Sequence, residues 1–178
     1  MWNPDRYKEA LTFAATRHGD QREPGHGLPY VVHLCKVAME VQRAAVDDAS
    51  FDVDLAVTAA LLHDVVEDTA TTRGEVASHF GDAVAKAVAA LTKDASLPKE
   101  QRMLDSLARI RAEPKAVWVV KVADRITNLE EPPSSWSIDK RRAYHAEAAT
   151  IRDHLRGALA SLEARFEHKI AAYARWCG

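Results

Sequence analysis

The stretch "DLAVTAALLHDVVED", residues 54–68, joins an apolar segment to a strongly charged one. Apolar side chains lie on nearly every side of residues 54–62, a pattern typical of a helix buried in a core. Four ionisable residues, His63, Asp64, Glu67 and Asp68, come directly after it. Charged groups are seldom buried unless they are paired or bind a metal. The stretch therefore predicts one central helix over 54–68 with a functional site at its C-terminal end.

Helix-start signals recur on both sides of this stretch. Asn3 followed by Pro4 suits an N-cap and a first helical position. Thr72 and Glu75 have the spacing of a capping box, in which each side chain bonds the other residue's backbone N–H. Gly81 then predicts a break between a short helix and the next one. The sequence therefore predicts helices before and after the central one.

Further helices are predicted by apolar spacing and by prolines. Residues 30–45 repeat apolar side chains at helical spacing, and Pro98 and Pro114 suit the first turns of two more helices. The segment "AVWVVKVA", residues 116–123, is rich in β-branched residues, which favours a strand. No second strand is available to pair with it, so we expect a buried helix there. The patterns together predict an all-α fold, a single-domain helical bundle.

An apolar stripe runs along the C-terminal part of the chain. Its members recur at steps of three and four on one helical face, and they are Ile151, Leu155, Leu159, Leu162, Phe166, Ile170 and Tyr173. Such a stripe predicts a helical extension over 150–176 that packs on the bundle. The alternative is that this helical surface receives a partner subunit and forms a homodimer.

Length and composition fit one soluble domain. The 178 residues are 47% hydrophobic and 28% charged, and the net charge of -2 offers no general attraction to nucleic acid or to a membrane. We find no apolar signal core at the N-terminus and no apolar run of about 18 residues, so no membrane span is expected. Cys35 and Cys177 lie far apart and are expected to be reduced thiols of a cytoplasmic protein. The absence of a P-loop argues against ATP-driven chemistry.

The charged end of the central stretch has the donors of a metal site. His63 and Asp64 are about 100° apart around a helix and can reach one point. His33 begins an apolar helix and Asp124 ends the run "VWVVKVA", although each also fits an ordinary role as a hydrogen-bonded or ion-paired residue. Three acids near a helix C-terminus oppose the helix dipole, so an offsetting cation is expected, unless the end is simply solvated. Two imidazoles and two carboxylates suit Mn²⁺, Fe²⁺ or Zn²⁺ better than Ca²⁺ or Mg²⁺.

Five motifs occur in a fixed order along most of residues 6–150. They are "FAATRHGDQR" (13–22), "GLPYVVH" (27–33), "AALLHDVVEDT" (59–69), "HFGDAVAKAVAALTK" (79–93) and "KVADRITNL" (121–129). In this order the chain resembles the HD superfamily of metal-dependent phosphohydrolases, and more narrowly the hydrolase domain of RelA/SpoT-type alarmone enzymes. It ends about where the synthetase domain of that family would begin, so it resembles the stand-alone small alarmone hydrolases. The resemblance implies one HD-type domain over 1–178, with the catalytic motifs in 18–145.

The resemblance also implies which residues form the catalytic centre. His33, His63, Asp64 and Asp124 match the ligands of one divalent metal, usually Mn²⁺ in this family. Glu67 and Asp68 match the pair that positions and deprotonates the attacking water, and a carboxylate one helical turn from the ligands is suited to accept a proton.

Substrate contacts are implied for five further residues. Arg22 matches a basic residue that packs on the guanine base, where a guanidinium stacks favourably on a purine. Asn128 matches a residue that contacts the ribose region, and Tyr144 a tyrosine near the substrate. Lys93 and Arg125 match basic positions, but either could instead be a carboxylate-paired structural residue.

The reaction implied is metal-dependent hydrolysis of the 3′-pyrophosphate of guanosine tetra- or pentaphosphate, which gives GDP or GTP and pyrophosphate. The partner would be a small guanine nucleotide rather than a nucleic acid or a membrane. Glu23 and Thr127 depart from the family's pattern near the substrate. Two alternatives therefore stay open: a phosphohydrolase for another nucleotide such as NADPH, and an alarmone-binding regulator without turnover. Glu67 and Asp68 argue against the second, because a binder needs no general base.

Overall fold

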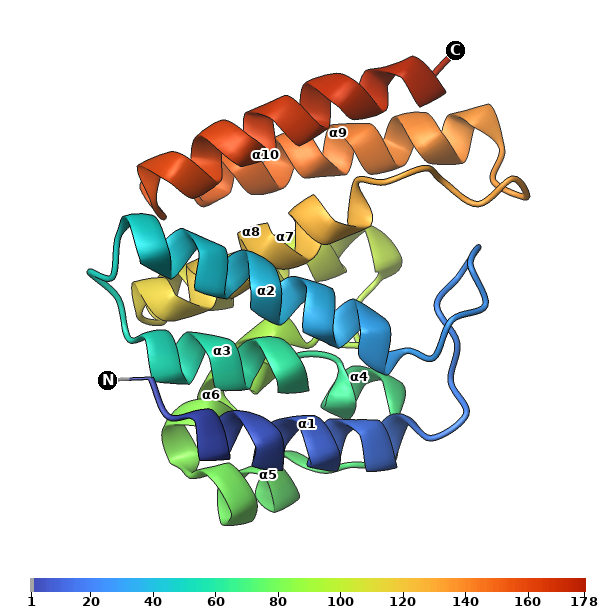
Figure 1. Cartoon of the computed structure of the whole chain (residues 1–178). Coiled ribbons are helices and arrows are strands. Elements are labelled where there is room, and N and C mark those ends of the chain that lie inside the picture. Colours follow the sequence, from blue (N-terminus) through green and yellow to red (C-terminus); the bar gives the residue numbers. More distant parts are fainter. Residues whose placement is uncertain (1) are drawn as a thin grey trace.

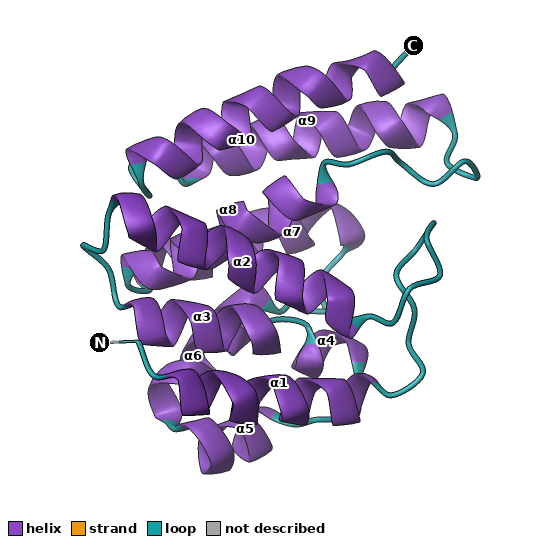
Figure 2. Cartoon of the chain, viewed as in Figure 1, coloured by secondary structure: helices purple, strands orange, loops and turns teal. Residues whose placement is uncertain are grey.

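The computed structural model describes residues 2–178 and consists of helices joined by loops (Figures 1 and 2). Within that range, the only β-type pairing is a single bridge between Arg22 and Pro29. The helices are α1 (Pro4–His18), α2 (Val31–Asp47), α3 (Val53–Leu62), α4 (Val65–Asp68), α5 (Arg73–Phe80), α6 (Asp82–Leu91), α7 (Lys99–Ala112), α8 (Lys115–Asn128), α9 (Ile138–His154), α10 (Ala160–Tyr173) and a short 3-10 helix, Ala174–Trp176. The predicted all-α fold class is confirmed.

Helices α3 and α8 form the centre of the bundle. Every residue of α3 from Ala56 to Leu62 is buried, as is every residue of α8 from Ala116 to Thr127 except Trp118. α2 packs against both, and α10 packs against α8 (Figure 1). The apolar run in α8 is a buried helix, as predicted, because other helices surround it and satisfy its hydrophobic side chains.

The predicted continuous helix over 54–68 is wrong. α3 and α4 are separate, and a turn at His63 and Asp64 joins them. The His63 Nδ1–H donates to the carbonyl of Ala60 at 2.8 Å, which satisfies one of the free carbonyls at the end of α3. Asp64 is the N-cap of α4. Asp64 thus caps a helix of a single turn that contains Glu67 and Asp68, and none of them ends a long helix, so the dipole argument for an offsetting cation does not apply.

The C-terminal stripe lies on two helices, not on one. α9 begins well before residue 150, and α10 returns antiparallel to it along the top of the bundle (Figure 1). Gly157, in the connecting turn, has a φ of 92°, a backbone conformation that residues other than glycine rarely adopt. All seven stripe residues are buried. The prediction that the stripe packs on the bundle is therefore confirmed, whereas the prediction of one helix for the whole stripe is wrong.

The predicted helix starts are largely confirmed. The Asn3 side chain accepts hydrogen bonds from the first backbone N–H groups of α1, and Thr72 with Glu75 forms the reciprocal capping box of α5. Pro98 and Pro114 are the N-cap residues of α7 and α8, one position earlier than the first helical turn that was predicted for them. Local signals thus place helix starts to within one residue.

Two loops project on the same side of the bundle, residues 19–30 between α1 and α2 and residues 129–137 between α8 and α9 (Figure 1). They touch, because a Cβ on Gly25 would lie 3.1 Å from the Cγ of Pro133. Gly25 also has a φ of 89°, so glycine suits this position for two separate reasons. These loops enclose the space next to the charged turn.

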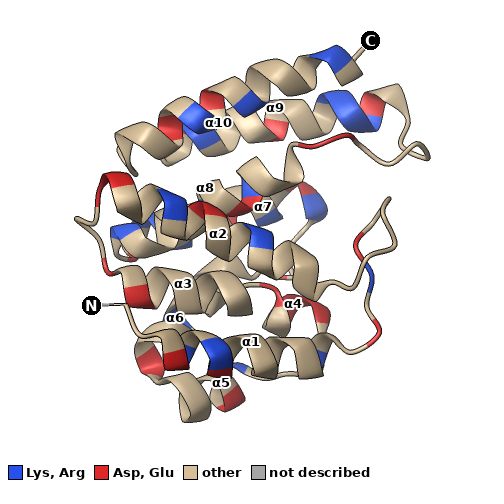
Figure 3. Cartoon of the chain, in the orientation of Figure 1, with Lys and Arg blue, Asp and Glu red and all other residues tan. Residues whose placement is uncertain are grey.

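Charges of both signs are interspersed on most helices, whereas α4 carries acidic residues only (Figure 3). Among residues 2–178, no helix is long and apolar enough to cross a membrane.

Candidate metal centre

The four predicted metal ligands come from three parts of the bundle and meet at one point. His33 lies in the first turn of α2, His63 and Asp64 in the α3–α4 turn, and Asp124 in α8. Candidate donor atoms of His33, His63 and Asp64 all lie within 4.8 Å of one another. The Oδ1 of Asp124 lies 3.6 Å from the Nε2 of His33 and 3.7 Å from the Nε2 of His63. Donors spaced in this way can share one ion at the usual ligand distances of about 2.0–2.3 Å.

His63 shows that these residues fit a divalent metal ion. Its Nδ1 donates to the Ala60 carbonyl, so Nδ1 carries a proton and Nε2 is the nitrogen that faces the cluster and would bind an ion after losing any proton of its own. That Nε2 is buried without a hydrogen-bond partner, since the Oδ2 of Asp64, although only 2.9 Å away, is not aligned for one. A histidine that binds a metal commonly donates its other ring N–H to a carbonyl in this way.

Neighbouring side chains hold the two carboxylates. The Tyr30 hydroxyl donates to the Oδ2 of Asp64 at 2.5 Å, and the buried Lys121 ammonium lies 3.1 Å from the Oδ2 of Asp124. The Asn128 amide donates to the Oδ1 of Asp124 at 2.6 Å. Neither Tyr30 nor Lys121 was predicted as a site residue from the sequence. Only Lys121 had a local signal, its spacing of three residues from Asp124 on one helix.

The charges of the cluster keep the carboxylates ionised. Burial alone would raise the pKa of Asp124, but the Lys121 ammonium and the two nearby histidine rings hold it well below its usual range. Burial likewise disfavours ionised Asp64, and the His63 ring outweighs it and lowers the pKa of that carboxyl. Burial would lower the pKa of His63, whereas Asp64 and Asp124 raise it well above 6.5. Ionised carboxylates are the form that a metal requires.

Glu67 and Asp68 follow the ligands but have different partners. The Oε2 of Glu67 accepts the backbone N–H of Lys93 at 2.9 Å, and the Lys93 ammonium lies 3.2 Å from its Oε1. The Oδ2 of Asp68 accepts the Gln21 amide at 2.8 Å. Burial, followed by the charges of Asp64 and Glu67, raises the pKa of Asp68 against the opposing effect of the Gln21 bond. A raised pKa makes a carboxylate a better proton acceptor near neutral pH.

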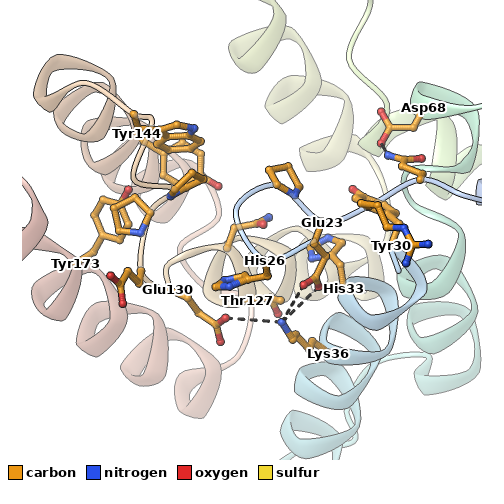
Figure 4. Close-up of a pocket in the computed structure, with 18 residues that line it drawn as sticks. Glu23, His26, Tyr30, His33, Lys36, Asp68, Thr127, Glu130, Tyr144 and Tyr173 are labelled. Atoms are coloured by element: carbon orange, nitrogen blue, oxygen red, sulfur yellow. Dashed lines mark hydrogen bonds and ion pairs between the residues drawn. The ribbon is translucent and has the colours of Figure 1, made fainter. Parts of the chain in front are cut away.

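A cavity of about 320 Å³ opens beside the cluster, between the two loops and α9 (Figure 4). His33 and Asp68 line one part of it. Three of the residues predicted to contact the substrate, Arg22, Asn128 and Tyr144, also line it. A cavity of this size can hold a small molecule. The structure thus brings the candidate ligand His33, the carboxylate of Asp68 and three candidate substrate residues to one cavity.

Lys93 and Arg125 do not line that cavity. Lys93 pairs with Glu67, as described above. Arg125 is buried, pairs with Glu147, and lies over the Tyr144 ring with its guanidinium carbon 4.2 Å from the ring centroid. Both therefore have the carboxylate-paired arrangement that the sequence analysis weighed as the alternative to direct substrate contact.

The remaining walls include residues that the motifs did not indicate. The Lys36 ammonium lies 3.3 Å from the Oε1 of Glu23 and 3.8 Å from the Oε2 of Glu130, so it bridges the two loops (Figure 4). Trp136 packs edge-on against Tyr144 with ring centroids 5.2 Å apart. Glu23 and Thr127, which also lines the cavity, had been noted beforehand as departures from the family's pattern.

Comparison with known proteins agrees with this geometry. The model of the HD domain family matches residues 10–162. The chain belongs to the HD domain family. Within it, the human guanosine-3′,5′-bis(diphosphate) 3′-pyrophosphohydrolase MESH1 is 35% identical over 165 residues, which is 90% of each chain. The Drosophila melanogaster protein of the same name is 32% identical over 172 residues, or 91% of each chain. The predicted family is confirmed.

Solved structures give the same fold for this HD domain. One, described as a metazoan ortholog of SpoT that hydrolyzes ppGpp and plays a role in starvation responses, superposes with a TM-score of 0.83 and 29% identity over 97% of both chains. The lmo0812 protein from Listeria monocytogenes EGD-e superposes with a TM-score of 0.61 and 25% identity, over 80% of this chain and 99% of its own.

Proposed function

We propose that this HD domain hydrolyses the 3′-pyrophosphate of guanosine tetraphosphate (ppGpp) and pentaphosphate (pppGpp), leaving GDP or GTP. One observation carries the proposal: the candidate ligand His33 lines the cavity, as do Tyr30 and Asn128, which bond the ligands Asp64 and Asp124, so a nucleotide there would have its phosphates beside the ion. The names of the human and fly relatives, which match over nearly their whole length, support the substrate.

We propose Mn²⁺ as the ion, held by His33, His63, Asp64 and Asp124. Two imidazoles and two carboxylates also suit Fe²⁺ and Zn²⁺, and the family's usual metal favours Mn²⁺. A divalent ion bound there supplies a Lewis acid that polarises a phosphoryl oxygen and lowers the pKa of water toward about 7.

Asp68 is proposed to accept the proton of the attacking water. Its carboxylate lines the cavity and its pKa is raised, as a general base near neutral pH requires. Water adds to the phosphorus next to the 3′ oxygen, the bond from that oxygen to phosphorus breaks, and pyrophosphate leaves as the 3′ oxygen takes up a proton. Glu67, fixed by Lys93, is proposed to help position the water.

The nucleoside is proposed to lie between the two loops. Arg22 would stack on the guanine and Asn128, which also holds Asp124, would contact the ribose region. Tyr144 would face the substrate, with Arg125 behind its ring. Lys93 and Arg125 are thus assigned to holding Glu67 and Tyr144 rather than to the substrate.

The test is to incubate the purified chain with Mn²⁺ and ppGpp and to measure pyrophosphate and GDP by anion-exchange chromatography. We expect turnover by the wild type, none by His63→Ala or Asp64→Ala, and unchanged turnover by Glu167→Ala, an exposed change on α10. A parallel panel should contain pppGpp, NADPH and nucleoside phosphates. Faster release of phosphate from NADPH than of pyrophosphate from ppGpp would refute the proposed substrate, and tight ppGpp binding without product would indicate a regulator.

We also propose that the protein works in the cytoplasm and binds neither nucleic acid nor a membrane. Its two free thiols, Cys35 and Cys177, support the location, and its net charge of -2 supports the absence of nucleic-acid and membrane partners. A homodimer through a helical surface stays a prediction that light scattering can test.

A further inference from the structure

Asp68 is held by side chains at and just after the end of α1. The Gln21 Nε2 donates to the Oδ2 of Asp68 at 2.8 Å, and the Gln21 Oε1 lies 2.8 Å from the Nδ1 of His18. His18 is the last residue of α1 and only 6% exposed. Two side chains from the motif "FAATRHGDQR" therefore lead from the bundle to the proposed proton acceptor.

The direction of these hydrogen bonds follows from Asp68. An ionised carboxylate can only accept, so Gln21 must turn its NH₂ group toward it and its carbonyl oxygen toward His18. His18 must then carry a proton on Nδ1 and donate it. The Oδ2 of Asp68 already accepts the Gln21 bond, so Oδ1 has both of its lone pairs available for a proton from water. The bond thus orients the carboxylate and favours Oδ1 as the oxygen that takes the proton.

His18 and Gln21 are themselves held in place. The Gln21 backbone N–H donates to the His18 carbonyl, and the Tyr30 backbone N–H donates to the Gln21 carbonyl, each at 2.9 Å. The rings of His18 and Tyr30 pack with centroids 4.8 Å apart. The hydroxyl of the same Tyr30 donates to Asp64. The Tyr30 side chain thus contacts both His18, at the start of the chain of bonds to Asp68, and the candidate metal ligand Asp64.

Asp68 needs such support because its own helix offers little. α4 has only four residues, and Asp68 is the last of them. A single helical turn is not stable by itself. A displacement of about 1 Å at a reacting group can lower a rate by about 100-fold.

We propose that His18 and Gln21 are positioning residues for Asp68, an inference that rests on the proposed function. Residues that hold a catalytic or metal-binding group from behind typically contribute about 10- to 100-fold to activity or affinity. Here the contribution should fall on kcat, because the bond orients the proton acceptor.

The first test is a double-mutant cycle on kcat for ppGpp with Mn²⁺. We expect Gln21→Leu to lower kcat about 10- to 100-fold, with KM within about threefold and Mn²⁺ affinity by calorimetry unchanged. In an Asp68→Ala background, Gln21→Leu should lower the single-turnover rate no further. An equal loss in both backgrounds would overturn the inference, because a merely structural effect does not depend on Asp68.

The second test separates the hydrogen bond of His18 from its packing. His18→Phe keeps a ring against Tyr30 but removes the N–H, and should lower kcat. His18→Asn places an amide N–H near the position of Nδ1 and should restore much of it. Thr16→Ala, an exposed change whose hydroxyl bonds only the Thr12 carbonyl, is the matched control and should leave kcat unchanged. Equal activity of the Phe and Asn variants would argue against the proposed bond.

A third measurement keeps this inference separate from the proposed substrate. The melting temperatures of wild type, Gln21→Leu, Asp68→Ala and the double variant report the bond without any turnover. We expect the two single shifts to be non-additive. Additive shifts would overturn the inference even in an active enzyme. If the shifts are non-additive but the protein does not hydrolyse ppGpp, the proposed function is wrong. The Gln21–Asp68 bond would then be supported, but its role in catalysis would be refuted.

Discussion

At the scale of single residues, the charges around Asp124 keep its buried carboxylate ionised and available to a metal ion. Its carboxylate is shared by the Lys121 ammonium, the Asn128 amide and the two histidine rings. Both members of the Lys121–Asp124 pair are buried. A buried carboxylate that loses its cation is strongly destabilising, so Lys121 stabilises the cluster until a metal supplies a second positive charge.

Replacement of Lys121 tests this balance. Lys121→Met should lower the stability of the metal-free protein by about 3–5 kcal/mol, because it leaves Asp124 buried without a cation. Since a metal ion can replace that charge, Mn²⁺ should raise the melting temperature of the variant by more than it raises that of the wild type. Differential scanning fluorimetry with and without Mn²⁺ measures both shifts. Lys115→Met, an exposed change on the same helix, is the control. An equal Mn²⁺ shift in all three proteins would contradict this account.

At the scale of helices, caps decide where the short elements begin. α5 starts at a capping box in which the Glu75 carboxylate accepts the Thr72 backbone N–H at 2.8 Å, and the Thr72 hydroxyl accepts the Glu75 N–H at 3.2 Å. These bonds, and then the Arg17 guanidinium, lower the pKa of Glu75. The cap should therefore depend on pH as well as on sequence.

The capping box gives a prediction with a defined pH range. Thr72→Ala should cost about 1 kcal/mol, and so lower the melting temperature by about 2–4 °C. The folded pKa of Glu75 is depressed, so its contribution is present above the unfolded pKa of about 4.3 and is lost as pH falls through the folded value. Glu75→Gln should therefore melt below the wild type at pH 7 and together with it near pH 2. If Glu75→Gln still melts below the wild type near pH 2, the difference does not come from the charge of Glu75.

The α9–α10 hairpin depends on apolar burial instead. Phe166 is 1% exposed and lies in the core that α10 shares with the bundle. Phe166→Ala should cost about 3–5 kcal/mol, through lost burial and the cavity left behind. The exposed neighbour Glu167, changed to Ala, should stay within about 0.5 kcal/mol of the wild type. Chemical unfolding of both variants compares the two sides of one helix, and similar midpoints would refute the packing described for this hairpin.

At the scale of the whole molecule, the site belongs to no single part of the chain. The cavity is lined by residues from Gln21, just after α1, to Tyr173 at the end of α10. The candidate ligands join α2, the α3–α4 turn and α8. A metal ion bound there would connect three elements that are distant in sequence. Such an ion binds the folded chain only, so it stabilises the fold as a whole.

Metal removal should therefore lower global stability. At a free metal concentration of about 100 times Kd, the bound ion contributes about 2.7 kcal/mol, which corresponds to about 5–11 °C in melting temperature for a chain of this size. A chelator should abolish that increment in the wild type and have no effect on Asp64→Ala. Calorimetric scans with EDTA and with added Mn²⁺ make the comparison. An unchanged wild-type melting temperature would mean that no ion links these elements.

The sequence by itself determined the all-α class, most helix starts and the four candidate metal ligands. Helical periodicity and caps such as Thr72 and Glu75 are local, so they can be read without the fold. The ligands were identified through motif resemblance, and the bundle then brings their side chains to one point.

Only the tertiary structure decided how the charges of the site are used. The pairing of Lys93 with Glu67 and the support of Asp68 by Gln21 both depend on contacts between residues far apart in sequence. The same holds for the α9–α10 hairpin, where a continuous apolar stripe folds back at Gly157. Side-chain direction and chain reversal are set by long-range packing, which apolar spacing alone does not encode.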